Sequence, residues 1–183
     1  MIAIIDSCFI IDWSKYRKKH LIKNLFDLIY IHEENLSQLK SFEAINFTSD
    51  LFNSNILRLY PWSMRDEDEY IRLRNELTLN SRIPSLERPD LLCLIIAKNT
   101  NGILLSENTG IHRVTQYHPR YMSVKVWTAI ETIENMIYHG ILEITNINEF
   151  KEYVNEYEND TGHIFKSKRI NEAIGRLSLW LKR

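Results

Sequence analysis

The stretch MIAIIDSCFIIDW, residues 1–13, decides which fold the sequence predicts. A short apolar run, rich in β-branched residues, leads straight to Asp6 and predicts a buried strand. The residues after it predict the start of a helix, for which Ser7 is a candidate N-cap. A carboxylate is costly to bury without a partner, so an acid at the end of a buried strand indicates a site that uses it.

Length and composition are those of one ordinary globular domain. The chain has 183 residues, of which 44% are hydrophobic and 26% are charged. The sequence has neither the run of about 18 apolar residues that a membrane helix requires nor the features of a signal peptide. Cys8 and Cys93 lack the spacing of a zinc site or a disulfide framework. We therefore expect a cytoplasmic protein without a membrane partner.

Charge is distributed unevenly along the chain. The net charge is −1, so binding of a polyanion would need a local basic patch or a metal ion. The segment KYRKKH, residues 15–20, is basic, and so is the segment 166–183. A polyanion-binding patch and a solvated helix face explain each of these two segments equally well.

Strand-like runs alternate with helical patterns along the first 145 residues. The runs are IAIID (2–6), IYIHE (29–33), SNILRLYPW (54–62), ILLS (103–106) and VKVW (124–127), and one of the helical patterns spans residues 35–47. This alternation predicts an α/β fold, with three layers (α/β/α) and a mostly parallel central sheet. Residues 146–183 predict two further helices, a C-terminal extension packed on the domain formed by residues 1–145. The first of these helices is acidic and the second basic, so we expect them to pair with each other or with a partner.

Several polar residues follow the ends of predicted strands. In a parallel sheet, the carboxyl ends of the strands share one crevice. Asp6 follows the first strand, and Glu107 and Asn108 follow the strand at 103–106. Glu87 and Asp90 lie at the start of the preceding helix, where Asp90 alone is also explained as a helix cap. Carboxylates that converge need a counter-charge, and Mg²⁺ or Mn²⁺ suits a set of oxygen ligands.

These stretches resemble the PIN domain, a metal-dependent nuclease fold found in many toxin–antitoxin ribonucleases. The resemblance covers about residues 1–145 and rests on three stretches, IIDSCFIIDW, IYIHEENLSQL and ERPDLLCLIIAKNTNGILLSENTGI. The third stretch is the most specific, because it joins an acidic helix start, an apolar helix, a Gly, a buried strand and then Ser-acid-Asn-x-Gly. The resemblance implies the same layered fold.

The resemblance also implies roles for individual residues. Asp6 matches the first acid of the family, Asp90 the acid at the start of the later helix, and Glu107, or Asn108 beside it, the acid after the next strand. Asp6, Asp90 and Glu107 are thus the implied catalytic residues and metal ligands, with Glu87 as a neighbouring ligand.

A second set is expected to hydrogen-bond a ligand carboxylate or a water molecule, and Ser106 of this set occupies the usual Ser/Thr position of the family. Its members are Ser7, Gln38, Ser106 and Asn108.

The chain departs from the family pattern at the second acid. The Glu expected before a Leu is replaced by Gln38, in SQL. Glu43, Glu34 and Glu33 are nearby acids that could substitute, and we include Glu43 in the predicted metal set. Without a substitute, the metal site would be weakened or lost.

An intact site would imply metal-dependent hydrolysis of RNA phosphodiester bonds, with Mg²⁺ or Mn²⁺ as the cofactor. The resemblance further implies the toxin of a toxin–antitoxin pair, with an antitoxin protein and a second copy of the chain as partners. Contacts to RNA phosphates need positive charge. The cations predicted to bind RNA are Lys15, Arg17, Lys18, Arg88 and Arg113.

The main alternative is a PIN-like module that has lost activity and binds RNA or a protein partner, and Gln38 favours it. A phosphatase of the haloacid dehalogenase type would need a second Asp at position 8, which is Cys8. A Rossmann nucleotide-binding domain would need a Gly-rich turn where the chain has DSCF (6–9). We interpret Cys8 as a small packing residue rather than a catalytic thiol.

Overall fold

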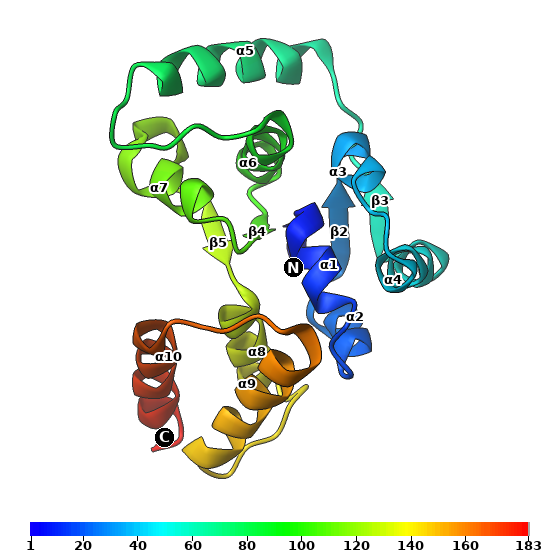
Figure 1. Cartoon of the computed structure of the whole chain (residues 1–183), viewed down its shortest axis with the longest axis vertical. Coiled ribbons are helices and arrows are strands. Elements are labelled where there is room, and N and C mark those ends of the chain that lie inside the picture. The colour runs from blue at the N-terminus through cyan, green and yellow to red at the C-terminus, as the bar shows by residue number, and fades with distance from the viewer. Residues whose placement is uncertain (183) are drawn as a thin grey trace.

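A five-stranded parallel sheet lies at the centre of the molecule (Figure 1). The structure is a computed structural model that describes residues 1–182, so Arg183 of the basic segment lies outside the described residues. The strand order is β3-β2-β1-β4-β5, and every neighbouring pair is parallel. This confirms the predicted α/β class. The strands are β1 Ile2–Ile5, β2 Leu28–Ile31, β3 Leu57–Leu59, β4 Ile103–Leu105 and β5 Lys125–Trp127.

Helices cover both faces of this sheet. One face carries α1 Ser7–Trp13, α2 Ile22–Leu25, α4 Phe42–Asn53, α8 Ala129–Tyr138, α9 Ile147–Thr161 and α10 Ser167–Trp180. The other face carries α5 Met64–Thr78, α6 Arg88–Thr100 and α7 Thr109–Tyr117. Short helical turns are α3 Glu33–Ser37, η1 Lys19–Leu21 and η2 Pro119–Tyr121. Within residues 1–182, none of the helices has the length and apolar character needed to cross a bilayer.

Side chains of β1 and β4 alternate between two buried apolar clusters, as the two-residue period of a strand requires. In β1, Ala3 and Ile5 belong to the cluster under α1 and α8, whereas Ile4 belongs to the cluster under α6. In β4, Leu104 faces α6 and Leu105 faces the opposite layer. The sheet is therefore the middle of three layers, as the sequence predicts.

Helix α6 brings an acid to the carboxyl edge of the sheet. The helix is buried from Leu91 to Ala97, because this segment is apolar on all sides. A Pro in its first turn favours the helix start, and Asn101 ends the helix with a left-handed backbone at φ 51°. Asp90 lies in the half-buried first turn, where it lines the same pocket as Asp6 after β1.

Local structure differs from the sequence prediction at two points. Asp6, not Ser7, is the N-cap of α1, because its N–H still donates to Leu105 O of the sheet at 3.1 Å. The helical pattern at 35–47 holds two helices, α3 and α4. They are separate because Ser41 begins α4 as its N-cap, accepting a hydrogen bond from Ala44 N at 3.2 Å.

The C-terminal extension packs on the layer that contains α1 and α8 (Figure 1). Its Tyr157 contacts Trp13 and Tyr16, with ring centroids 5.6 and 5.3 Å apart. Within the described residues, no ion pair joins the acidic helix α9 to the basic helix α10. Acids of α9 instead bind the segment after α1, and Arg176 of α10 binds the buried Glu134 of α8 at 2.6 Å. The division at residues 145/146 stays a prediction.

Candidate metal centre

The candidate site lies where the carboxyl ends of β1 and β4 meet. These strands are neighbours, with β2 and β3 on one side and β5 on the other, so the chain changes winding direction between them. Ligands of parallel α/β sheets bind in the crevice at such a switch point. A pocket of about 640 Å³ opens there. It is lined by the start of α1, by Gln38, by residues of the segment 84–90 and by the start of α7.

Asp6 is fixed at the edge of this pocket by hydroxyl groups. Its side chain is buried, with 2% exposure. Oδ2 accepts a hydrogen bond from Ser106 Oγ at 2.9 Å. Oδ1 lies 3.2 Å from Ser7 Oγ, which is also 2.5 Å from Gln38 Oε1. Because a hydroxyl has one proton, Ser7 donates to one of these two oxygens at a time.

Asp90 faces the same pocket from the first turn of α6. Its Oδ2 accepts a hydrogen bond from Glu87 N at 3.3 Å, so it also caps the helix. The side chain of Asn108 acts to lower the pKa of this carboxylate. Asn108 is held in turn, because its Oδ1 accepts from Gly110 N at 2.8 Å and its N–H donates to Ser106 Oγ at 3.1 Å. Ser106 thus links Asp6 to the turn that holds Asn108.

Negative charge accumulates in the pocket without a matching cation. Burial raises the pKa of Asp6, against the hydrogen bonds from Ser106 and Ser7. Burial and then the charge of Asp6 raise the pKa of Asp90 to about 6. Among the described residues, the pocket lining includes Asp6, Glu87 and Asp90 but no Lys, Arg or His. Two carboxylates that repel each other in a buried site favour a bound cation.

The donor set of the pocket fits a hard divalent ion. Asp6 and Asp90 supply carboxylate oxygens, and the side-chain amide of Gln38 supplies a neutral oxygen at the same rim, whereas Asn108 Oδ1 accepts from Gly110 N. Oxygen ligands of this kind suit Mg²⁺ or Mn²⁺ rather than a soft metal. Glu87 also lines the pocket, at the N-cap of α6.

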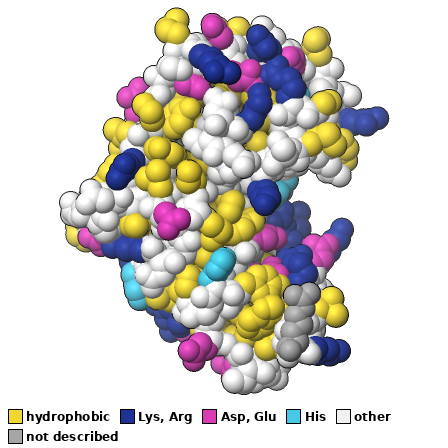
Figure 2. Space-filling model, turned by 180° about the vertical axis from the view of Figure 1, so that it is seen from behind, with side chains coloured by type: hydrophobic (Ala, Val, Ile, Leu, Met, Phe, Trp, Pro, Cys, Tyr) yellow, Lys and Arg dark blue, Asp and Glu magenta, His cyan; other side chains and the backbone are white. Residues whose placement is uncertain are grey.

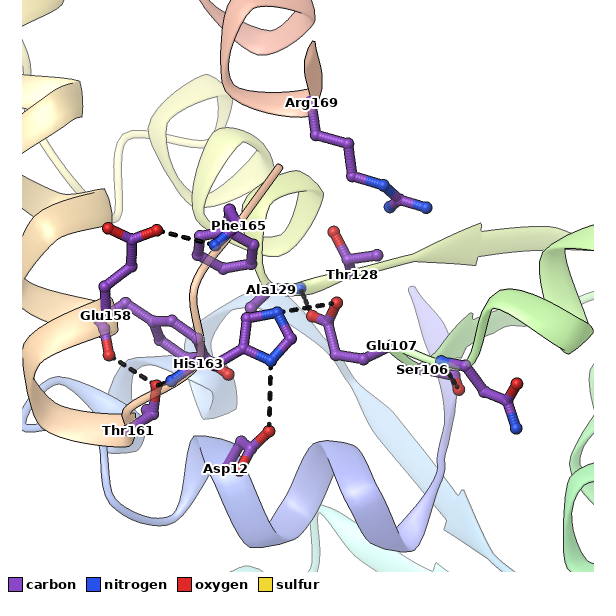
Figure 3. Close-up of polar contacts among 12 residues, drawn as sticks. Asp12, Ser106, Glu107, Thr128, Ala129, Glu158, Thr161, His163, Phe165 and Arg169 are labelled. Atoms are coloured by element: carbon purple, nitrogen blue, oxygen red, sulfur yellow. Dashed lines mark hydrogen bonds and ion pairs between the residues drawn. The ribbon is translucent and has the colours of Figure 1, made fainter. Parts of the chain in front are cut away.

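Glu107 is directed to the opposite side of the sheet end (Figure 3). Its Oε1 accepts a hydrogen bond from Ala129 N, at the start of α8, at 2.7 Å. Its Oε2 lies 3.7 Å from His163 Nε2. Burial raises the pKa of Glu107, although the Ala129 N–H and His163 act to lower it. The strand period explains this direction, since Ser106 faces Asp6 and the next side chain must face the layer of α1 and α8.

The acids considered as substitutes for the second family acid lie outside the described pocket lining. Glu43 is exposed in the first turn of α4. Glu34 accepts a hydrogen bond from Arg88 Nε at 2.8 Å. Within residues 1–182, no three His, Cys, Asp or Glu side chains form a group that could hold a metal. The structure therefore brings Asp6 and Asp90 together, and leaves Glu107 and Glu43 apart from them.

His163 of the extension is a contact residue that the sequence reasoning did not identify. Its Nδ1 lies 3.6 Å from Asp12 Oδ2, and its ring packs against Phe165 at 4.8 Å between centroids. With Glu107, these groups form a polar contact between the extension and the sheet end (Figure 3). No spacing signal in the sequence links His163 to residues that lie more than fifty positions earlier.

Most cations predicted to bind RNA have carboxylate partners in the structure. Arg17 binds Asp160 at 2.6 Å, and Lys18 binds Glu156, both acids of α9. Lys15 lies 3.4 Å from Asp12 Oδ1. Two further cations lie nearer the pocket.

Arg88 binds both Glu34, at 2.8 Å, and Glu67, at 2.9 Å. Arg113 differs from the other four, because its Nη1 donates to the carbonyl oxygen of Arg82 at 3.1 Å instead of to an acid.

Cys8 lines the pocket and is exposed, so it is not the packing residue that we predicted. It faces outward from the first turn of α1, beside both pocket carboxylates. Partial desolvation of the thiol by the surrounding pocket wall, and then the charges of Asp6 and Asp90, raise the pKa of Cys8 to about 11. The thiol is therefore protonated near neutral pH, and a thiolate nucleophile is disfavoured.

Comparison with known proteins relates this fold to a solved structure. No protein-family model matches the chain, and no curated protein matches it. Among solved structures, this chain is similar to a chain in a crystal structure from Rickettsia felis. That structure is of VapBC2 bound to a DNA fragment from the VapBC2 promoter. The TM-score is 0.50 at 20% sequence identity, over 70% of this chain and 98% of that chain. A likeness at this identity shows that the two chains share the α/β fold.

Proposed function

We propose that this chain is a PIN-type, divalent-metal-dependent endoribonuclease whose metal binds between Asp6 and Asp90. One observation carries the proposal: two carboxylates with raised pKa line one pocket at the switch point of a parallel sheet, among described lining residues that include no cation. The resemblance of the sequence to PIN domains and the similarity to a chain of VapBC2 support the same reading.

The polar residues of the pocket have distinct roles in this proposal. Asp6 and Asp90 would hold the cation, with the side-chain oxygen of Gln38 as a further donor, and Asn108 would orient Asp90 from the start of α7. Ser106 keeps the Asp6 carboxylate oriented through the hydrogen bond at 2.9 Å. When bound, the ion lowers the pKa of a water molecule and offsets the charge that grows on the phosphate. Glu107 instead contacts Ala129 N at the start of α8 and His163 of the extension.

Toxin–antitoxin pairing is part of this proposal. The similar chain belongs to a complex named VapBC2. By analogy, an antitoxin protein and a second copy of this chain are the proposed protein partners. Expression of the chain alone should then arrest growth, whereas the Asp6→Asn variant should not.

A second candidate function is an inactive PIN-like module that binds RNA or a protein. Gln38 in place of an acid favours it, and so does the direction of Glu107 away from the pocket. Two carboxylates bind a divalent ion less tightly than three or four do, so the module would retain the fold without the reaction.

The test is cleavage of a labelled single-stranded RNA in Mn²⁺ and in EDTA. We expect cleavage in Mn²⁺ only, with the rate reduced at least about 100-fold by Asp6→Asn or Asp90→Asn, because changes to residues that merely support a metal ligand already cost 10–100-fold. Asp12→Asn is the matched control, since Asp12 lies on the same helix but outside the described pocket lining. RNA binding without cleavage by the wild-type chain would favour the inactive module.

A second readout is independent of activity. Mn²⁺ should raise the melting temperature of the wild-type chain and of Asp12→Asn, because a ligand that binds only the folded state stabilises it. It should not raise that of Asp6→Asn. An equal shift in all three proteins would place the ion elsewhere.

A further inference from the structure

A second cavity lies beside the acidic pocket, across a short segment of chain. It has a volume of about 480 Å³ and is lined by the end of α5, by residues of the segment 80–86 and by Leu91. Pro84, Ser85 and Leu86 line both cavities. The two hollows are therefore adjacent, with this three-residue strip between them.

The strip is held against α7 by close packing. A Cβ atom added to Gly110 would lie 2.5 Å from Leu86 Cδ2 and 3.3 Å from Pro84 Cγ. The backbone of α7 therefore approaches the strip at a distance that only glycine permits. Ile83, just before the strip, is buried with 6% exposure and anchors this end of the strip in the apolar cluster under α6.

Arg74 lines the second cavity, Arg82 and Arg113 lie beside it, and none of the three forms an ion pair within the described part of the chain. Arg74 lines the cavity from α5, and Arg82 lies in the segment that forms its wall. Arg113 of α7 is tied to this wall, because it donates to the carbonyl oxygen of Arg82. All three side chains are exposed. Figure 2 shows Lys and Arg side chains gathered, among acids, at the end of the molecule where α5 lies.

Most cations of the other basic clusters have acidic partners. Arg17 and Lys18 bind acids of α9. A cavity of about 390 Å³ beside α10 is also basic, but Arg169 lies 3.7 Å from Glu131 there, and Lys168 lies 3.9 Å from Glu172. Phosphate contacts need cations that are not already paired, so the arginines of the second cavity are the better candidates.

An aromatic ring completes this surface. Tyr117, at the end of α7, is 37% exposed. The guanidinium carbon of Arg82 lies 5.9 Å from the centre of its ring. Exposed tyrosine rings and arginine planes are the groups on which unpaired bases stack.

We propose that Arg74, which lines this cavity, and Arg82 and Arg113 beside it bind the phosphates of a single-stranded RNA that crosses the strip from the acidic pocket. This inference rests on the proposed function, because it takes the scissile phosphate to lie between Asp6 and Asp90. It assigns the RNA surface to α5, the segment 80–86 and α7, in place of the basic segment 15–20.

The experiment measures the binding of a fluorescein-labelled, unstructured RNA to the full chain in EDTA, by anisotropy at several salt concentrations. The test variant is the triple change Arg74→Gln, Arg82→Gln and Arg113→Gln. We expect its Kd to rise at least about tenfold, and the slope of log Kd against log salt to fall by about 2, since each lost contact to a single strand contributes about 0.7. Melting temperatures establish that the variant is folded.

A matched control removes the same charge elsewhere, from exposed side chains without ion pairs in the described residues. It is the triple change Arg58→Gln, Lys151→Gln and Lys182→Gln. We expect its Kd to stay close to that of the wild type. Equal weakening in both triple variants, or wild-type binding by the test variant, would overturn the inference.

The outcomes separate this inference from the proposed function. Arginine-dependent binding without cleavage in Mn²⁺ would refute the nuclease and keep the RNA surface. Cleavage that depends on Asp6 but not on the three arginines would refute the surface and keep the nuclease. Absence of RNA binding by the wild-type chain in EDTA would refute the surface, and absence of cleavage in Mn²⁺ as well would refute both.

Discussion

Ser106 and Glu107 are adjacent in the sequence but serve opposite sides of the sheet end. Ser106 Oγ donates to Asp6, whereas Glu107 accepts from Ala129 N. The meeting of Asp6 and Asp90 follows from strand ends that share one crevice, which the sequence can predict. The direction of Glu107 also follows from sequence, because alternation along ILLSE places it opposite Ser106. The resemblance alone left Glu107 and Asn108 as alternatives, and the alternation favours Asn108 as the residue at the pocket.

The Ser106 hydroxyl should matter for metal binding. Ser106→Ala removes the donor to Asp6 and the acceptor for Asn108 N–H in a fully buried position. We expect the Kd for Mn²⁺ to rise by about 10–100-fold, the usual cost of losing a group that orients a ligand. Isothermal titration measures it. Ser37→Ala is the control, since Ser37 only donates to Glu34 O on α3, and an equal loss there would contradict the role of Ser106.

At the scale of the helices, charge fixes the extension in a way that the sequence did not reveal. The acidic and basic helices were expected to pair with each other or with a partner. Instead each binds a different element, α9 through Arg17 and α10 through Glu134. Which opposite charges meet depends on how the helices cross, and this is not encoded in the composition of one segment.

The pair of Arg176 and Glu134 tests how firmly α10 is held. Glu134 is 3% exposed and Arg176 is 47% exposed, so Arg176→Met leaves a buried carboxylate without its cation. We expect the free energy of unfolding to fall by about 2 kcal/mol, less than for a fully buried pair, because Tyr138 still donates to Glu134 at 2.6 Å. Urea unfolding measures this value. Lys168→Met, whose pair with Glu172 is exposed, should change it by less than about 0.5 kcal/mol.

The contact between α5, α6 and η2 should make stability depend on acid pH. Burial acts to raise the pKa of Glu69, but hydrogen bonds from Lys98, Tyr121 and Arg120 outweigh it and lower the pKa to about 2. The ordinary pKa is 4.5. The unfolded chain therefore binds a proton at a higher pH than the folded chain does, so this stabilisation is complete above pH 4.5 and is lost as the pH falls toward 2.

Glu69→Gln should accordingly lower the free energy of unfolding at about pH 6, and its difference from the wild type should shrink by about pH 3. Urea unfolding at several pH values measures the difference. Glu152→Gln changes an exposed acid that forms no ion pair within the described residues, and should show no such trend. A difference between Glu69→Gln and wild type that is constant with pH would contradict the assignment.

At the scale of the whole molecule, the sequence predicts the three-layer fold better than it predicts where unpaired positive charge lies on the surface. The alternation of strands and helices gives the parallel sheet and its two helical layers, because these depend on local pattern and on the burial of apolar faces. The position of the unpaired cations depends on which ion pairs form between residues that are far apart in the sequence. Arg17 and Lys18 are bound by acids that lie about 140 positions later, which leaves the unpaired arginines near α5 and α7.

The most direct test of the central claim is the position of Mn²⁺ in a crystal of the full chain, located by its anomalous scattering. We predict a peak within coordination distance of the carboxylates of Asp6 and Asp90, which is absent from crystals of Asp6→Asn. A peak only beside Glu107 and His163, or none in the pocket at a Mn²⁺ concentration that supports cleavage, would contradict the account.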